Sequence, residues 1–188
     1  MRKKSRLTAD SKIYFIDACH FLHNAIAGYG WIKRGTTLEL LTNSGRNRFN
    51  VLGAYSPDDA SFLSIEGEQS CDAEMLRELL IKIRTANPSN ARQIVILDNA
   101  RYCHARVVKK LARKLKIELL YLPPYSPNLN LIERFWKFMK KKVAKNKYYP
   151  SFDLFVAAVQ NFLNNLDEFS EELNSLMTQS FHLFKAAC

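Results

Sequence analysis

Three acidic side chains lie where they could act together on one substrate. Asp17 follows an apolar run at residues 13–16, and Asp98 follows another at residues 94–97. Glu133 lies on a predicted helix, one residue off its apolar stripe. Converging carboxylates repel one another and lose hydration, and a divalent cation removes that penalty. Because oxygen ligands suit Mg²⁺ or Mn²⁺, the pattern favours phosphodiester chemistry with two ions about 4 Å apart.

Each acid also fits a purely structural role. An aspartate after a strand often caps a turn or a helix. A glutamate on a lysine-rich helix often pairs with a lysine four residues on, which here is Lys137. The chemistry therefore depends on whether the fold brings the three acids together.

The elements that must position these acids begin with a meander. Residues 13–16 predict a short buried strand that Asp17 ends, and residues 31–32 and 37–42 suggest more extended chain. Turn signals at residues 43–45 and 56–59 separate predicted strands at 46–55, antiparallel to the first, and 61–66.

Helices and buried strands alternate in the rest of the chain. Asp72 is a predicted N-cap for a helix with an apolar stripe over residues 75–83. The continuous apolar run 94–97 predicts a parallel strand buried on both faces, and residues 119–122 predict its neighbour. The helix between them has one apolar face, with Val107, Val108, Leu111, Ala112 and Leu115, and one basic face, with Arg106, Lys109, Lys110, Arg113 and Lys114.

A stiff loop at residues 123–127 leads into a predicted long helix over residues 129–143, and a further amphipathic helix covers residues 152–162. The order predicts an α/β protein with a mixed sheet, an antiparallel meander followed by parallel strands, flanked by helices. In such sheets the functional crevice lies beyond the carboxyl ends of the parallel strands.

The charge of the chain favours a polyanionic partner. The 188 residues, enough for one domain, carry 28 Lys and Arg against 18 Asp and Glu, a net charge of +10. DNA or RNA is the leading candidate, and a merely basic domain is the alternative. No apolar run approaches a membrane span or a signal peptide, so we expect a cytoplasmic protein with its four cysteines reduced.

Three motifs surround the acids: FIDACHF at residues 15–21, ILDNA at 96–100 and LPPYSPNLNLIERFW at 122–136. They resemble the motifs of DDE transposases, most closely the mariner-type superfamily in its bacterial insertion-sequence branch. A gap of 34 residues separates Asp98 from Glu133, which is a spacing that this superfamily uses. The resemblance extends from about Lys12 through the C-terminal helices.

This resemblance implies a ribonuclease H-like fold and a triad of Asp17, Asp98 and Glu133 that binds two Mg²⁺ ions, with Mn²⁺ as a substitute. It implies cleavage of a DNA strand at a transposon end, within the terminal inverted repeats. The freed 3′-hydroxyl then attacks target DNA, usually at TA, with the protein as a homodimer on DNA. It also implies a bacterial protein associated with the nucleoid.

Full-length relatives carry helix-turn-helix domains ahead of the catalytic domain. We therefore interpret residues 1–11 as a basic N-terminal segment or linker remnant and residues 12–188 as the catalytic domain. A fragment, a separate reading-frame product and an isolated catalytic unit all fit that interpretation.

Other residues are candidates for contacts with DNA or with zinc. Trp31, Lys33 and Arg34 form an aromatic and basic cluster, although Trp31 equally fits a core position. The remaining DNA candidates lie near the second and third acids: Asn99, His104, Lys137, Lys140 and Lys141. The cysteines and histidines at positions 19, 20, 23, 103 and 104 match no standard zinc spacing.

Two other functions fit the same residues. A two-metal endonuclease of this fold would cut DNA without joining the 3′-hydroxyl to a target. An inert DNA-binding derivative would keep the fold and lose the chemistry. The presence of all three acids favours an enzyme.

Overall fold

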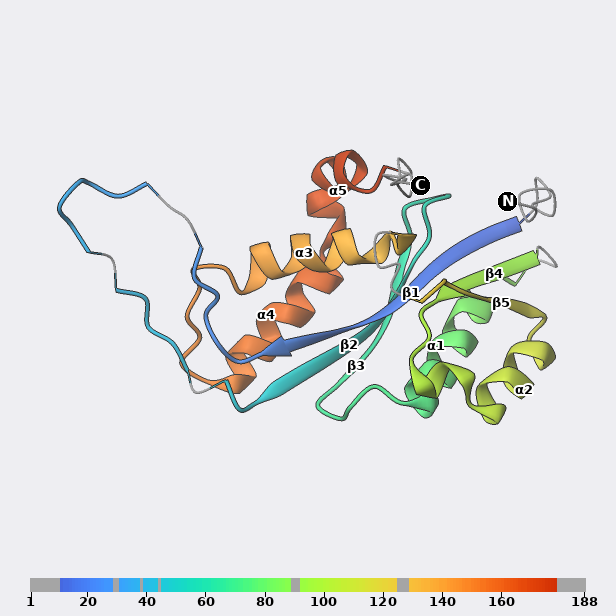
Figure 1. The fold of residues 1–188 in the computed structure, drawn as a ribbon. Coiled ribbons are helices and arrows are strands. Elements are labelled where there is room, and N and C mark those ends of the chain that lie inside the picture. Colours follow the sequence, from blue (N-terminus) through green and yellow to red (C-terminus); the bar gives the residue numbers. More distant parts are fainter. Residues whose placement is uncertain are drawn as a thin grey trace, which may run out of the picture.

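The computed structural model describes residues 11–28, 31–37, 39–43, 45–88, 92–124 and 129–178. Its sheet has the strand order β3-β2-β1-β4-β5 (Figure 1). The strands are β1 (Ser11–Leu22), β2 (Arg48–Tyr55), β3 (Phe62–Gly67), β4 (Arg92–Leu97) and β5 (Ile117–Tyr121). The first three pair antiparallel, whereas β4 lies parallel to both β1 and β5. The predicted meander followed by parallel strands is confirmed.

Helices cover both faces of this sheet (Figure 1). On one face lie α1 (Ala73–Ala86) and α2 (Arg106–Lys114), with the short 3₁₀ helix η2 (Arg101–His104) before α2. On the other lie α3 (Ile132–Val143), α4 (Phe152–Asn164) and α5 (Ser170–Leu176), with η4 (Leu166–Phe169) leading into α5. The predicted N-cap is confirmed, since Asp72 Oδ1 accepts hydrogen bonds from two backbone N–H groups at the start of α1.

Alternating side chains of β1 supply two separate cores. Tyr14 and Ile16 pack with α1 and α2, while Phe15 and Cys19 pack with the helices of the opposite face. This alternation follows from the two-residue period of a strand. It also decides which functional side chains of β1 face which layer.

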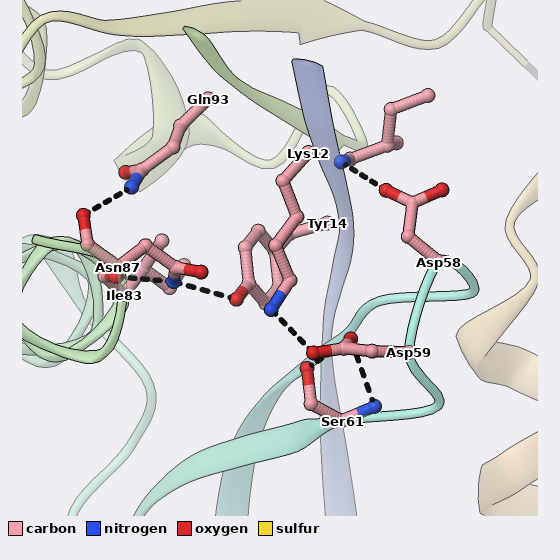
Figure 2. Close-up of polar contacts among 9 residues, drawn as sticks. Lys12, Tyr14, Asp58, Asp59, Ser61, Ile83, Asn87 and Gln93 are labelled. Atoms are coloured by element: carbon pink, nitrogen blue, oxygen red, sulfur yellow. Dashed lines mark hydrogen bonds and ion pairs between the residues drawn. The ribbon is translucent and has the colours of Figure 1, made fainter. Parts of the chain in front are cut away.

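Polar contacts fasten the N-terminal end of β1, away from Asp17 (Figure 2). The backbone N–H of Ile13 donates to Asp58, and Lys12 Nζ lies 2.6 Å from Asp59 Oδ2 in the turn after β2. On the other side, Asn87 Nδ2 donates to the Tyr14 hydroxyl over 2.7 Å. These contacts fix the start of the strand against both a turn and the end of α1.

Two local predictions are wrong. The described residues between 31 and 42 form no strand, because β1 and β2 pair directly up to Leu22 and Arg48 and the segment between them projects beyond the sheet (Figure 1). Val107 was expected on the buried face of its helix and is 51% exposed, because the nine-residue α2 buries only Val108 and Ala112.

Some predictions lie outside the described residues, among them nearly all of the N-terminal segment 1–11 and the loop positions 125–127. Among the helices that the structure describes, none combines the length and apolar character needed to cross a membrane.

Candidate active site

Asp17 lies where β1 loses one of its two neighbours. The parallel pairing with β4 ends at Phe15, whereas the antiparallel pairing with β2 continues through Leu22. The prediction that Asp17 ends the strand is therefore wrong: β2 carries the strand five residues farther. Asp17 shares the alternation of Phe15 and Cys19, so its side chain lies on the α3 face.

A glycine on β2 lets α3 approach this part of the sheet closely. Gly53 is the register partner of Asp17, and a Cβ at Gly53 would lie 2.6 Å from Cη2 of Trp136 and 2.7 Å from Cζ of Phe62. The Trp136 ring therefore occupies the space that any larger residue at position 53 would fill. This contact seats α3 beside Asp17.

Glu133 lies in the first turn of α3 and shares a hollow with Asp17. The hollow has a volume of about 270 Å³. Its lining includes both acids and three further residues of α3 at helical spacing, Trp136, Lys137 and Lys140, together with residues 18–20 of β1. The hollow therefore combines carboxylates with lysines from one face of one helix.

Asp98 is exposed at the carboxyl end of β4, two residues after Ile96, which packs against the α3-side core. The backbone N–H of Ala100 donates to its Oδ1 over 3.0 Å. The buried thiol of Cys103 donates to the same oxygen, with an Sγ–Oδ1 distance of 3.7 Å. Burial raises the pKa of this thiol to about 12, so it remains a donor at neutral pH.

The electrostatics of Asp17 reflect this crowding. Burial and, to a smaller extent, the charges of Asp98 and Glu133 together raise the pKa of its carboxyl to about 7. The backbone N–H of Ala18 acts in the opposite direction. Burial also raises the pKa of Glu133, which Lys137 partly offsets. The structure thus brings Asp98 and Glu133 each within electrostatic reach of Asp17.

The residues fit a divalent cation by their chemistry. The candidate ligands are carboxylate oxygens, which suit hard ions such as Mg²⁺, and a cation would offset both the burial and the neighbouring charges that raise the pKa of Asp17. As placed in the described parts of the chain, no three His, Cys, Asp or Glu side chains are close enough to hold a metal ion. The acids therefore share a region without forming a ready-made cage.

Two polar groups of this region escape detection from sequence. The buried indole N–H of Trp136 has no hydrogen-bond partner among the described residues, although the ring lines the hollow. Buried Asn130 donates to the carbonyl of Ile16, which ties the start of α3 to β1 one residue before Asp17. The surroundings of both groups include residues that are distant in the sequence, so no local sequence pattern predicts them.

The predicted DNA-contacting residues fall into three groups. Lys137 and Lys140 line the hollow, while Lys141 is exposed one turn after Lys137 and is not part of the lining. Asn99 donates through Nδ2 to the carbonyl of Leu122 and so fastens the ends of β4 and β5 together, while exposed His104 stacks on Tyr121. The third group, Trp31, Lys33 and Arg34, is exposed on the segment between β1 and β2, and Trp31 is not a core residue.

The candidate zinc ligands are not brought together. Cys19 is buried on the α3 side of the sheet and Cys103 on the α1 side. Asn50 is buried, and its Nδ2 donates to the carbonyls of residues 68 and 69. Its Oδ1 lies 2.6 Å from Nδ1 of His20. Because that oxygen can only accept, His20 carries its proton on Nδ1. His23 Nε2 instead lies 2.9 Å from the Tyr149 carbonyl.

Comparison with known proteins gives one family and several relatives. The sequence profile of the family described as DDE superfamily endonuclease matches residues 12–155. An uncharacterized protein of Sinorhizobium fredii, y4pE/y4sA, is 35% identical over 83 residues, covering 44% of this chain and 59% of that protein. The "Insertion element IS630 uncharacterized 39 kDa protein" of Shigella sonnei is 23% identical over 164 residues, covering 86% of this chain and 47% of that protein. The chain thus spans about half the length of these relatives.

Solved structures share the fold at low sequence identity. A Mos1 transposase paired-end complex with the left transposon end has a TM-score of 0.60 at 16% identity, covering 95% of this chain and 59% of that chain. The Mos1 strand transfer complex has a TM-score of 0.62 at 17% identity, covering 88% and 49%. The catalytic domain of Mos1 mariner transposase has a TM-score of 0.55 at 16% identity, covering 95% and 88%. These matches confirm the predicted ribonuclease H-like fold.

Proposed function

The chain belongs to the DDE superfamily endonuclease family, and from this membership we propose that it is the catalytic domain of a DNA transposase. It would cut a DNA strand at a transposon end and join the freed 3′-hydroxyl to target DNA. One observation carries the proposal: Asp17 and Glu133 line the same hollow, and the charges of both Glu133 and Asp98 act on Asp17. The similarity to an insertion-element protein and to Mos1 transposase supports it.

We assign the two Mg²⁺ ions of this chemistry to Asp17, Asp98 and Glu133, with Mn²⁺ as a substitute. When bound, the ions would supply Lewis-acid activation of the attacking oxygen and stabilisation of the leaving oxygen. The carboxylates must be ionised to bind them. Since Asp17 has a pKa of about 7, cation binding releases a proton near neutral pH.

The remaining residues of the site orient these acids and attract the substrate. Ala100 and Cys103 both donate to Oδ1 of Asp98, so its other oxygen is the one available to a ligand. The Trp136 ring limits the water around Asp17, which strengthens electrostatic interactions there. Lys137 and Lys140 line the same hollow as Asp17 and Glu133 and would contact the phosphates of the strand that is cut.

The proposal extends to the assembly on DNA. Residues 12–188 would act as the cutting and joining unit, on terminal inverted repeats and on a target that is usually TA. Two copies would act together, since transposition pairs two DNA ends. The bacterial cytoplasm, close to the nucleoid, is where such substrates occur.

The decisive experiment compares cleavage with joining. We expect the wild-type chain to cut transposon-end DNA with Mg²⁺ or Mn²⁺ and to join pre-cut ends to a target plasmid. Asp98→Asn should abolish both reactions while circular dichroism shows an intact fold. Full activity of Asp98→Asn would contradict the assignment of the triad.

The same assays separate the two alternatives. Cleavage without joining of pre-cut ends would identify an endonuclease. No reaction, together with no Mn²⁺ binding by calorimetry, would identify an inert DNA-binding derivative.

A further inference from the structure

Helix α2 and the short helix η2 before it carry a dense basic surface. Residues 99–117 contain no Asp or Glu. They contain seven Lys and Arg residues: Arg101, Arg106, Lys109, Lys110, Arg113, Lys114 and Lys116. We call these seven side chains the α2 basic face. For a chain with a net charge of +10, this short segment holds much of the excess.

No acidic side chain in the described part of the chain forms an ion pair with the α2 basic face. Within the described ranges, the ion pairs are Lys12–Asp59, Arg77–Glu74, Arg92–Glu118 and Lys142–Glu172, and none of them includes the seven. Six of the seven side chains are exposed, and the seventh, Lys109, lies 5.9 Å from the centre of the Tyr121 ring. On α1, by contrast, Arg77 is paired with Glu74. A solvated helix face usually mixes both signs, whereas this one does not.

The spacing of the charges suits a DNA strand. Val108 and Ala112 are buried against the sheet, whereas Arg106, Lys110 and Lys114 are exposed at intervals of four residues. Four residues of helix rise about 6 Å, so these three charges span about 12 Å. One strand of a duplex carries a phosphate about every 3.4 Å along its axis, so the row faces about three or four phosphates.

The α2 basic face begins beside the active site but belongs to the opposite layer of the sheet (Figure 1). The Cys103 thiol of η2 contacts Asp98, and the Tyr121 hydroxyl donates to the Cys103 carbonyl over 2.9 Å. His104 stacks on Tyr121 with ring centroids 4.2 Å apart. These contacts fasten η2 to β5, so the basic surface has a defined position relative to Asp98.

We propose that the α2 basic face is a second DNA-binding surface, which holds the phosphate backbone of a duplex without regard to sequence. It is distinct from Lys137 and Lys140, which lie in the hollow on the α3 side. The inference rests on the proposed function, because a protein that acts on DNA has DNA as its polyanionic partner. It adds that the chain contacts DNA from both layers of the sheet, with Asp98 between the two contacts.

The test compares two pairs of substitutions that remove equal charge. Lys110→Gln/Lys114→Gln removes two charges from the α2 basic face. Arg77→Gln/Lys82→Gln removes two from α1 in the same layer. Both lower the net charge from +10 by the same amount and keep good helix formers. Thermal unfolding first confirms that both variants are folded. Binding of a DNA duplex whose sequence is unrelated to a transposon end is then measured in EDTA between about 50 and 200 mM salt.

We expect the α2 pair to lower the slope of log affinity against log salt by about 2, and the affinity at about 100 mM salt by about tenfold. The α1 pair should lower the affinity less than about threefold. Equal losses in both pairs, no loss in the α2 pair, or no duplex binding by the wild-type chain would overturn the proposal. If the α2 pair lost affinity for an RNA duplex but kept its affinity for the DNA duplex, the proposal would also be overturned.

Because EDTA removes divalent cations, this result does not depend on strand cleavage. A wild-type chain that binds the duplex through α2 but never cuts DNA would contradict the proposed function alone.

Discussion

Helices α2 and α3 both carry many basic side chains, yet they differ in where those side chains point. α3 has an acid in its first turn, Glu133, and places Lys137 and Lys140 in the hollow that Asp17 shares. α2 has no acid and turns its basic residues to solvent, on the opposite face of the sheet. Positive charge alone therefore indicates a polyanionic partner, whereas the proposed chemistry also requires acids that the fold holds close together beside the sheet.

The region that contains α4 and α5 differs from both of these helices, because its charged residues are all acidic. Residues 152–178, which include α4 and α5, contain five acidic residues and no Lys or Arg. All five are exposed: Asp153, Asp167, Glu168, Glu171 and Glu172. A polyanion is repelled by this surface and attracted to the α2 basic face. DNA should therefore approach across the carboxyl ends of β4 and β5, and away from α4 and α5.

The largest expected effect comes from removing the acid of α3. Glu133→Gln keeps the size of the side chain and removes a carboxylate ligand, so metal-dependent cleavage should fall at least about a thousandfold, a loss of about 4 kcal/mol in transition-state stabilisation. Glu171→Gln removes an equal charge from exposed α5 and should change the cleavage rate less than about twofold. Equal activity of the two variants would remove the distinction between α3 and the rest of the acidic surface.

The second effect concerns the pH dependence of stability without metal. The pKa of Asp17 is about 7 in the folded chain against 3.8 as the ordinary value, so the folded state binds the extra proton between these values. Stability that is present below pH 4 is therefore lost as the pH rises through 7. Asp17→Asn lacks this loss. Between pH 5 and 8 the wild-type free energy of unfolding should fall by about 3 kcal/mol relative to Asp17→Asn.

Urea unfolding of both proteins in EDTA measures this difference, and groups that titrate in both cancel. Adding Mn²⁺ at pH 8 should restore stability to the wild-type chain more than to Asp17→Asn. Parallel pH curves for the two proteins would show that neither burial nor the charges of Asp98 and Glu133 raise the pKa of Asp17 in the folded chain.

The sequence predicts the order of elements well because local signals mark their boundaries. The apolar run before Asp98 and the cap at Asp72 lie where the structure has them. The end of β1 could not be predicted in this way. Its continuation past Asp17 depends on pairing with β2, whose partner residues lie between 26 and 34 positions farther along the chain, and no local signal marks it.

The three acids of the candidate site can be picked out from the sequence, whereas the contacts around them cannot. Asp17 and Asp98 directly follow continuous apolar runs, and Glu133 belongs to the long motif at residues 122–136. The packing of Trp136 on Gly53 joins α3 to β2 and leaves no local trace. In the segment between β1 and β2 a local signal was present, but it did not lead to a strand. The described residues there have no neighbouring strand with which to pair.

The third effect tests the close approach of α3 to the sheet. Gly53→Ala places a Cβ against the Trp136 and Phe62 rings, so one ring or the helix must move, at a cost of about 1–3 kcal/mol. Gly67→Ala is the matched control on β3, since a Cβ there meets only the Gln69 backbone nitrogen, at 3.9 Å. Urea unfolding should separate the two variants, and cleavage should fall in Gly53→Ala alone. Equal stability would mean that α3 is not seated by this contact.

The smallest effect separates lysines of a single helix and sharpens the contrast with α2. Lys137 lines the hollow and raises no steric problem when replaced, so Lys137→Gln should lower the cleavage rate at saturating DNA about tenfold, because a phosphate contact near the reacting atoms is lost. Lys141→Gln removes the same charge one turn farther along α3, outside the lining of the hollow, and should lower that rate less than twofold. If both variants lose only affinity, as expected for the α2 pair, then α3 would bind DNA as α2 does, and the acids alone would distinguish the two helices.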